Sequence, residues 1–227
     1  MCIRDRVTIV DDLAKVIRTS WNDLPNIECL DNDFPELTKE DLYISNEMRK
    51  CTGLRKIHLE VAKAGKLDVL HCVYFPDPKY VLPIFGCDII ATPSMVTAAI
   101  VDISPISGSN YIYERVKPIC DVFNFNEPRP LPEWGDIFSP YMKFQRIRQV
   151  EEQRKFLDVL MEYLIIYCDA VKVAQQGSPL TTAQRMADQI RYSIQQRKNP
   201  KTLAVLSNWF DKDWANNYIN NILFCTP

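Results

Sequence analysis

The stretch that most constrains this chain runs from residue 67 to residue 105, where apolar segments alternate with proline-bearing breaks. The segments are rich in Val and Ile, which favour strands. Connections this short join antiparallel neighbours, because a parallel connection needs a crossover of about a dozen residues or more. The stretch therefore predicts an antiparallel meander, with strands over Leu67–Phe75, Leu82–Ile90 and Val96–Ser104.

Ionisable residues interrupt these apolar segments at His71, Asp88 and Asp102. Alternate residues of a strand face opposite sides of a sheet, so His71 shares a face with Val73, and Asp88 shares one with Gly86. Burying a charge is costly unless the group changes its pKa or finds a partner. Two interpretations are open: His71 and Asp88 are satisfied polar groups of the core, or they face a pocket and handle protons.

The segment Leu54–Ala62 alternates between apolar and polar side chains and predicts a further strand of the same sheet. Its polar side chains at Lys56, His58 and Glu60 would share one face. The pattern alone favours solvent on that face. The alternative is that His58 and Glu60 line a ligand surface.

Helices are expected at both ends of the chain. The periodicity of residues 11–22 predicts a short amphipathic helix, and residues 23–40 are expected to form a loop. Residues 110–122 are interpreted as a strand followed by a helix, and residues 123–140 as a proline-rich connection. The last third predicts four helices. They run over residues 149–174, from a capping box at Thr181 to about Lys198, through Trp209 after a break at Asn199-Pro200, and onward from the N-cap Asp211.

Strands followed by helices favour an α+β fold, here a three-layer α/β/α sandwich with a central antiparallel sheet. The 227 residues are interpreted as a single domain, 1–227, of which residues 1–10 are expected to be non-native or disordered.

Composition narrows the classes of function. A net charge of −2 does not indicate a nucleic-acid-binding protein. The apolar runs are too short to span a membrane, and no signal peptide is evident, so a cytoplasmic protein is expected. The eight cysteines form no CxxC pair, which favours reduced thiols, and two histidines exclude a histidine-rich metal site.

Several catalytic motifs are missing from the sequence. It contains no GxGxxG dinucleotide fingerprint, no GxxxxGK phosphate loop and no GxSxG nucleophile elbow. A pocket with a carboxylate, an imidazole and apolar walls suits a flat apolar substrate that needs protons.

Longer motifs carry a resemblance to a known family. Three follow one another in the predicted sheet: LHCVYFP, LPIFGCDII and TAAIVDISP. Three more lie in the second half: PEWGDIFSPYMKF, QQRKNPKTLAVL and FDKDWANNYINNILF. Together, from about Leu54 to Phe224, they resemble the ferredoxin-dependent bilin reductases, nearest to the phycocyanobilin-forming branch and its short, phage-like members.

The resemblance implies that an α/β/α sandwich holds biliverdin IXα between its sheet and its C-terminal helices. It also implies a monomer that binds no flavin and no metal. Electrons would arrive singly from reduced ferredoxin, and the protein would supply protons to tetrapyrrole radical intermediates. Ferredoxins are acidic, so the contact with ferredoxin should be basic, with Lys198, Lys201 and Lys212 as candidates.

The same resemblance assigns roles to individual residues. Asp88 and His71 match the family's proton-handling pair, and Glu60 matches a carboxylate that donates a proton at the vinyl-bearing ring. Substrate contacts, chiefly to the propionates, are implied for Arg146, Gln196, Lys201, Thr97 and Asn199.

The product is open between two phycobilins. His71 favours the phycocyanobilin-forming branch, and Pro200 stands where many relatives carry an aspartate linked to reduction of ring A. The short length is similar to phage-like members that make phycoerythrobilin. We expect four-electron reduction of biliverdin IXα to phycoerythrobilin, with phycocyanobilin as the alternative. A bilin carrier without turnover, or an unrelated α+β interaction protein, are the remaining hypotheses.

Overall fold

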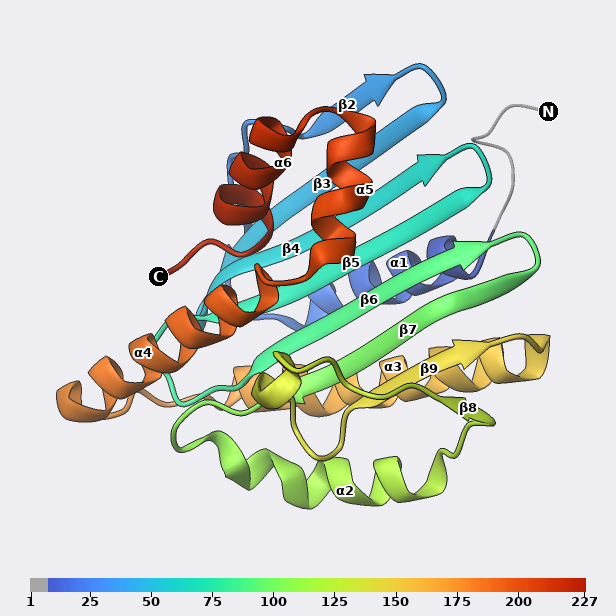
Figure 1. The fold of residues 1–227 in the computed structure, drawn as a ribbon. Coiled ribbons are helices and arrows are strands. Elements are labelled where there is room, and N and C mark those ends of the chain that lie inside the picture. Colours follow the sequence, from blue (N-terminus) through green and yellow to red (C-terminus); the bar gives the residue numbers. More distant parts are fainter. Residues whose placement is uncertain (1–7) are drawn as a thin grey trace.

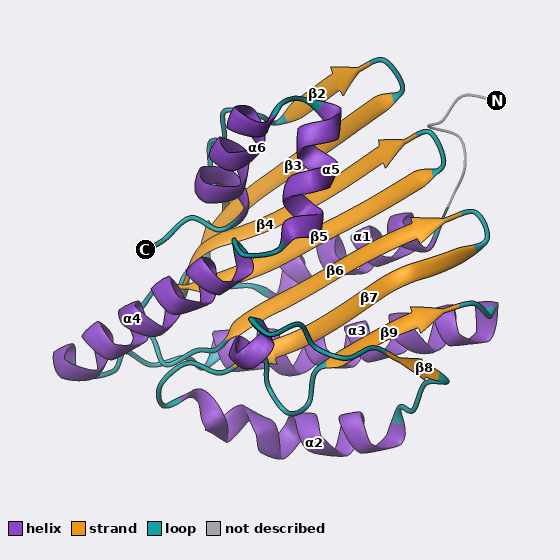
Figure 2. Ribbon diagram, in the orientation of Figure 1, coloured by secondary structure: helices purple, strands orange, loops and turns teal. Residues whose placement is uncertain are grey.

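The computed structural model describes residues 8–227 and places one antiparallel sheet between two groups of helices (Figures 1 and 2). The sheet has nine strands in the order β1-β3-β4-β5-β6-β7-β9-β8, with β2 beside β3. Helices α1 and α3 cover one face, and α2 packs beside α3. Helices α4, α5 and α6 lie over the other face. The predicted α/β/α sandwich is confirmed.

The strands and helices have the following bounds. The strands are β1 Glu28–Cys29, β2 Glu36–Lys39, β3 Leu42–Cys51, β4 Leu54–Ala64, β5 Leu67–Pro76, β6 Ile84–Thr92, β7 Met95–Ser104, β8 Glu127–Pro128 and β9 Lys143–Ile147. The helices are α1 Ile9–Ser20, α2 Tyr113–Val122, α3 Val150–Lys172, α4 Pro179–Gln196, α5 Pro200–Trp209 and α6 Lys212–Tyr218. Short 3-10 turns span Trp21–Asp23, Ser109–Ile112 and Gly135–Ile137, and a π-helical turn spans Ile219–Leu223.

The predicted meander is confirmed in β4 to β7, whose neighbours pair in chain order. Strand β3 was not predicted, although its sequence LYISNEMRKC alternates and buries Leu42, Ile44, Asn46 and Met48. Residues 23–40, expected to form a loop, contain β1 and β2, which pair with β3. Short segments such as these take strand geometry from their partner more than from their own sequence.

Further differences concern helix starts. Residues 110–112 form part of a 3-10 turn before α2 and not a strand. Helix α4 begins at Pro179 and not at Thr181, because the Ser178 hydroxyl is the N-cap and accepts a hydrogen bond from the Thr181 amide at 3.3 Å. The predicted N-cap Asp211 is confirmed by its hydrogen bond with the Trp214 amide at 2.8 Å.

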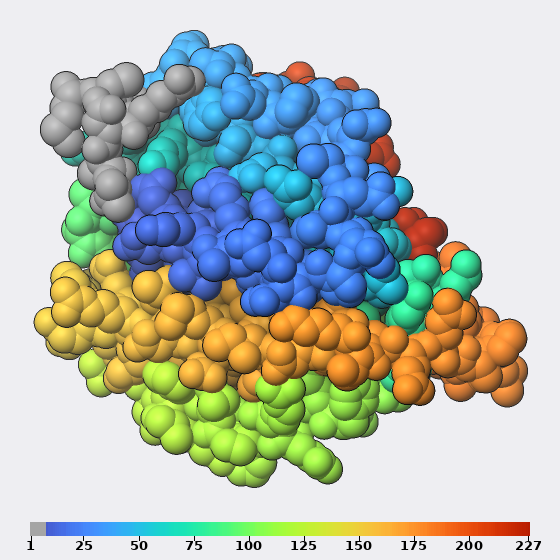
Figure 3. Space-filling model, turned by 180° about the vertical axis from the view of Figure 1, so that it is seen from behind, coloured from blue at the N-terminus to red at the C-terminus, as the bar shows by residue number. Residues whose placement is uncertain are grey.

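Two apolar cores lie on opposite faces of the sheet. In β5, Leu70, Cys72 and Tyr74 pack against α1 and α3, whereas Val73 and Phe75 pack under α4 and the C-terminal segment. Strand alternation therefore divides one apolar sequence between two layers. The back of the molecule shows α1 lying along α3 (Figure 3).

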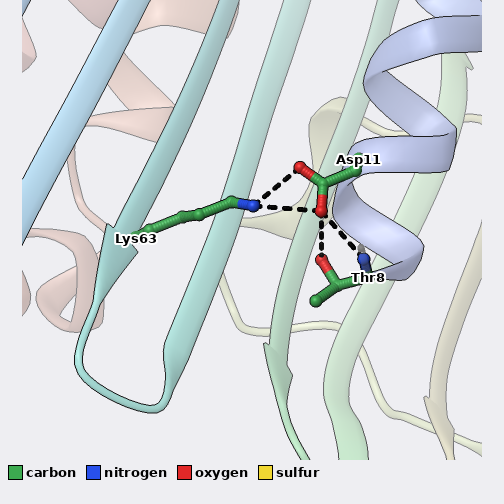
Figure 4. A network of polar contacts seen from close by, with 3 residues as sticks. All are labelled: Thr8, Asp11 and Lys63. Carbon is green, nitrogen blue, oxygen red and sulfur yellow. Dashed lines mark hydrogen bonds and ion pairs between the residues drawn. The ribbon is translucent and has the colours of Figure 1, made fainter. Parts of the chain in front are cut away.

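The start of α1 is attached to the sheet by an ion pair. Lys63 of β4 contacts both carboxylate oxygens of Asp11 at 2.8 and 3.0 Å, and Asp11 Oδ2 also accepts the Thr8 amide (Figure 4). Burial opposes ionisation of Asp11, but these hydrogen bonds outweigh it and lower the pKa of the carboxyl. The helix begins at Ile9, so residues 8–10 are ordered, and residues 1–7 lie outside the described part.

Two global properties follow from the described residues. The cysteines among residues 8–227 are all free thiols, as expected for reduced cysteines. No helix in this part of the chain has both the length and the apolar character to cross a membrane.

Packing between the sheet and α3 is expected to dominate stability. Ile89 of β6 is completely buried, and Ile165 of α3 is 54% exposed. We expect Ile89→Ala to lower the free energy of unfolding by about 2–5 kcal/mol, because it removes buried methyl groups and leaves a cavity. Ile165→Ala is the matched control and should change it by less than about 0.5 kcal/mol. Urea unfolding measures both, and equal losses would contradict the assignment of this core.

Candidate active site

A cavity of about 920 Å³ lies between the sheet and the segment that joins α4 to α5. Its floor is formed by β4 to β7 and its sides by residues 129–146 and the C-terminal helices. Its walls are largely apolar and aromatic, which suits a flat unsaturated ligand. The eight site residues predicted from the sequence all line it: Glu60, His71, Asp88, Thr97, Arg146, Gln196, Asn199 and Lys201.

Strand register brings the three ionisable floor residues into one row. Glu60 of β4 is paired with His71 of β5, and His71 is paired with Asp88 of β6. Residues directly opposite one another in antiparallel strands point to the same face, with β-carbons about 4.5–5.5 Å apart. The row therefore places two carboxyl groups on either side of one imidazole.

His71 and Asp88 form the closest contact in this row. His71 Nδ1 lies 2.6 Å from Asp88 Oδ1, and the Asp88 side chain is 42% exposed whereas that of His71 is 9% exposed. The His71 ring is held edge-on between the rings of His58 and Phe224, at centroid distances of 5.5 and 5.3 Å. A proton can thus move between the imidazole and a carboxylate that is open to the cavity.

The second ring nitrogen of His71 has no hydrogen-bond partner among the described residues, although it is buried. A buried polar atom without a partner is costly. A ligand with a polar group at this wall would remove that cost, which makes His71 a ligand-facing group as well as a partner of Asp88.

Glu60 lies deeper in the wall than Asp88. Its Oε2 is 2.5 Å from the Tyr218 hydroxyl, which lies 2.9 Å from Asn46 Oδ1. Burial raises the pKa of the Glu60 carboxyl, and the nearby His71 only partly opposes this. Burial also holds the pKa of His58 well below its usual value. Glu60 is therefore poised as an acid and His58 as a neutral imidazole.

The pattern-based prediction that the polar face of β4 is exposed to solvent is wrong. Lys56, His58 and Glu60 are at most 4% exposed, because α6 and the C-terminal segment cover them. Alternation of polar and apolar residues reports two different environments on a strand but does not show that the polar side faces water.

The remaining predicted residues lie outside the row of Glu60, His71 and Asp88, and four of them contact other protein groups through their side chains. Arg146 lies 3.8 Å from Glu127, and the Thr97 hydroxyl donates to a backbone carbonyl of β6. The side chain of Gln196 donates to the Tyr192 hydroxyl at 3.0 Å. Asn199 is the N-cap of α5, where its Oδ1 accepts the amide of Lys201. Arg146 and Lys201 supply cations that can bind carboxylates.

Other cavity residues were not predicted. Arg129 packs its guanidinium over the Phe144 ring at 5.0 Å and donates to the Thr97 carbonyl at 2.6 Å. The space beside Gly86, which has no side chain, is taken by the Tyr192 hydroxyl, which lies 3.2 Å from where a β-carbon would stand. The sequence around Arg129 is proline-rich, and that composition gave no indication that it borders a cavity.

Asp102 is excluded from this cavity. It is buried in β7, where its carboxylate accepts hydrogen bonds from the Ser104 and Ser139 hydroxyls and from the Ser139 amide. These contacts fix the loop after β8 against the sheet. Burial nevertheless raises the pKa of Asp102 to about 6. Among residues 8–227, no group of three or more His, Cys, Asp or Glu side chains could hold a metal ion.

Comparison with known proteins identifies the family. The ferredoxin-dependent bilin reductase model matches residues 14–225. The chain is 43% identical to phycocyanobilin:ferredoxin oxidoreductase from Synechococcus sp. (strain CC9902), over 96% of this chain and 93% of that protein. The chain belongs to the ferredoxin-dependent bilin reductase family. It is an oxidoreductase that acts on bilins with ferredoxin as the electron donor.

A second relative agrees with this bilin reductase assignment, and two solved structures share the fold. Phycocyanobilin:ferredoxin oxidoreductase from Prochlorococcus marinus (strain MIT 9303) is 39% identical over 96% of this chain and 87% of its own length. The fold matches a crystal structure of tomato phytochromobilin synthase in complex with biliverdin, with a TM-score of 0.80 at 15% identity over 93% of this chain and 82% of that one. A solved PcyX structure matches with a TM-score of 0.61 at 18% identity, over 96% and 97%.

The position of Asp88 generates a first prediction for this bilin reductase. Asp88→Asn keeps the shape of the side chain and its contact with His71 but removes the titratable proton. We expect bilin affinity to change by less than about threefold and turnover to fall by about 100-fold or more, as for loss of a general acid. Asp121→Asn on the exposed side of α2 is the control. Full turnover in Asp88→Asn would exclude Asp88 as a proton donor.

Asp102 generates a prediction on pH and stability. Its pKa rises from 3.8 to about 6 on folding, so the folded state binds more protons than the unfolded state between these values. Wild-type stability should therefore fall relative to Asp102→Asn as pH rises from 4 to 6.5, by up to about 3 kcal/mol. Urea unfolding across this range measures the difference. A constant difference would show that Asp102 titrates at its ordinary pKa.

Proposed function

We propose that this bilin reductase converts biliverdin IXα to phycocyanobilin by two successive two-electron reductions. The observation that carries the proposal is the row Glu60–His71–Asp88 on the cavity floor, which supplies two separate acids. Curated relatives at 39–43% identity over 96% of this chain are named for phycocyanobilin, which favours this product over the phycoerythrobilin expected from chain length.

Each two-electron step adds two electrons and two protons to the bilin. The electrons come from reduced ferredoxin, and protons come from the cavity floor. Asp88 and His71 share a proton at 2.6 Å and serve one end of the conjugated system. Glu60, one strand further along the row, serves the vinyl-bearing ring. The two acids, on β4 and on β6, give each reduction its own proton donor.

Residue 200 also bears on the product. Pro200 lines the cavity at the start of α5 and has no titratable group. Many of the bilin reductases that the sequence resembles carry an aspartate at this position. In phycoerythrobilin synthases that aspartate is linked to reduction of ring A. Protons for both reductions must then come from the floor, where Glu60 adds the acid needed at the vinyl-bearing ring.

The upper walls of the cavity are proposed to bind the substrate. Arg146 and Lys201 are cations at the cavity wall and would pair with the propionates, while Gln196 and Asn199 offer amides beside them. Thr97 adds a small hydroxyl next to Arg129. The aromatic side chains of Trp209 and Phe144 pack against a planar tetrapyrrole.

Electron entry is proposed to be direct, without a flavin or a metal bound to this chain. Lys198 and Lys201 belong to the cavity wall, so an acidic ferredoxin bound there would come close to the bilin. Lys212 is exposed at the start of α6 but stands between Asp211 and Asp213, which weaken its local positive potential. Lys198 and Lys201 are therefore the better candidates.

An anaerobic assay tests the product. Biliverdin IXα, a plant-type ferredoxin and a reducing system are incubated with the protein, and the pigments are separated against bilin standards. Phycocyanobilin is the expected product. Phycoerythrobilin would restore the expectation from chain length, and a bound but unchanged biliverdin would establish a carrier instead of an enzyme.

Glu60→Gln gives the sharper prediction. It should slow reduction of the vinyl-bearing ring by about 100-fold or more and leave the other reduction intact, because only the vinyl-bearing ring loses its acid. A two-electron-reduced bilin should then accumulate and be visible by chromatography. The matched control is Glu152→Gln, a buried glutamate on the opposite side of the sheet whose carboxylate accepts a backbone amide. Unchanged formation of phycocyanobilin would remove Glu60 from the reaction.

A further inference from the structure

A buried chain of hydrogen bonds leads from Glu60 away from the cavity. Glu60 Oε2 lies 2.5 Å from the Tyr218 hydroxyl, and this hydroxyl lies 2.9 Å from Asn46 Oδ1. Asn46 Oδ1 also lies 2.8 Å from His58 Nε2. The chain joins β3, β4 and α6, and the bilin reductase reaction as proposed uses only its first member.

The orientation of the Asn46 amide is fixed by a backbone group. Asn46 Nδ2 donates to the Phe34 carbonyl at 2.8 Å, so a flipped amide would place two oxygens against each other there. Asn46 Oδ1 must therefore face both the Tyr218 hydroxyl and His58 Nε2. A carbonyl oxygen has two lone pairs, so it can accept from both groups at once.

The number of available hydrogens then determines which group donates in each of these hydrogen bonds. The Tyr218 hydroxyl has one hydrogen. If that hydrogen goes to Asn46, the 2.5 Å contact with Glu60 needs a hydrogen from the carboxyl, and Glu60 is neutral. If an ionised Glu60 takes it, the oxygens of Tyr218 and Asn46 face each other at 2.9 Å with no hydrogen between them. Only a neutral Glu60 satisfies every contact.

The surroundings of Glu60 also bear on its ionisation. Its complete burial favours the neutral acid, and the charge of Asp88 acts in the same direction. His71 acts in the opposite direction. His58 is kept neutral by burial and by the nearby Lys56. Charged groups from the other elements around the cavity are Arg129, Glu133, Arg146, Lys198 and Lys201.

We propose that Tyr218 and Asn46 are positioning residues for a neutral Glu60 before the bilin binds: Asn46 accepts the Tyr218 hydrogen, and Tyr218 accepts the hydrogen of the Glu60 acid. The resting enzyme is thus loaded with the proton that Glu60 later delivers, and no water has to reach this closed part of the wall first. The role of that proton rests on the proposed function, whereas the loaded state of Glu60 can be observed without it.

The first experiment observes the carboxyl group directly, in protein without bilin. Infrared difference spectra at pH 7 compare wild type with Glu60→Gln. We expect a carbonyl band of a neutral carboxylic acid that Glu60→Gln abolishes and Asp88→Asn retains. If Glu60→Gln removes only carboxylate bands and no carboxylic-acid band, the proposal is overturned. Because no turnover is involved, this result is independent of whether biliverdin is reduced and to which product.

Two variants test which groups donate in these hydrogen bonds. In Tyr218→Phe the acid loses its acceptor, so its band should persist at a higher frequency, and reduction of the vinyl-bearing ring should slow by about tenfold with an unchanged KM. In Asn46→Ala the Tyr218 hydrogen is free to turn to Glu60, so the acid dissociation constant of Glu60 should rise about tenfold and its band should titrate at lower pH.

Tyr167→Phe is the matched control, because Tyr167 is equally buried but donates to the Pro83 carbonyl on the other face of the sheet. It should leave the band and its pH profile unchanged. Tyr218→Phe keeps the ring stacked on Trp214 at 4.6 Å, and urea unfolding checks that it folds. If Tyr218→Phe and Asn46→Ala both leave the Glu60 band where it is in wild type, the two residues only pack the core and the proposal fails.

Discussion

The register of β4, β5 and β6 is the constraint on which the rest of this bilin reductase depends. Cross-strand pairing puts Glu60, His71 and Asp88 in one row on a face that is otherwise apolar. A shift of one residue would turn every member of the row to the opposite core. The apolar residues next to them along the strands, such as Cys72, Cys87 and Ile89, are fully buried against the other helical layer and oppose such a shift.

Covering this row gives its groups their chemistry. Polar groups at a water-exposed sheet face would titrate near their ordinary values, whereas burial under α6 and the C-terminal segment raises the pKa of Glu60 and lowers that of His58. The hydrogen bonds of Tyr218 and Asn46 offset part of the desolvation cost. The same helices that complete the second core therefore also set the protonation of the site.

The proton-handling residues and the proposed substrate contacts lie on elements of different rigidity. The proton-handling residues lie in central strands, which are held on both sides by neighbouring strands. The proposed substrate contacts lie on β7, on β9 next to the edge strand β8, and around the α4–α5 junction, where Asn199 and Pro200 fix the start of α5. Rigid positions suit proton transfer over short distances, and edges and helix starts can vary between relatives that bind different bilins.

The sequence by itself determined the meander, the helical C-terminal third and the family, because strand alternation, proline breaks and long motifs are local properties. Strand alternation left a core or a pocket role open for His71 and Asp88, and the family resemblance favoured the pocket. Strand β3 and the short strands beside it depended on pairing and were missed. The strand pattern alone favoured solvent for the face of Lys56, His58 and Glu60, because it carries no information on what a helix about 160 residues later will cover. Only the tertiary structure brought Tyr218 to Glu60 and Asn46, since hydrogen bonds between distant residues depend on how the layers pack.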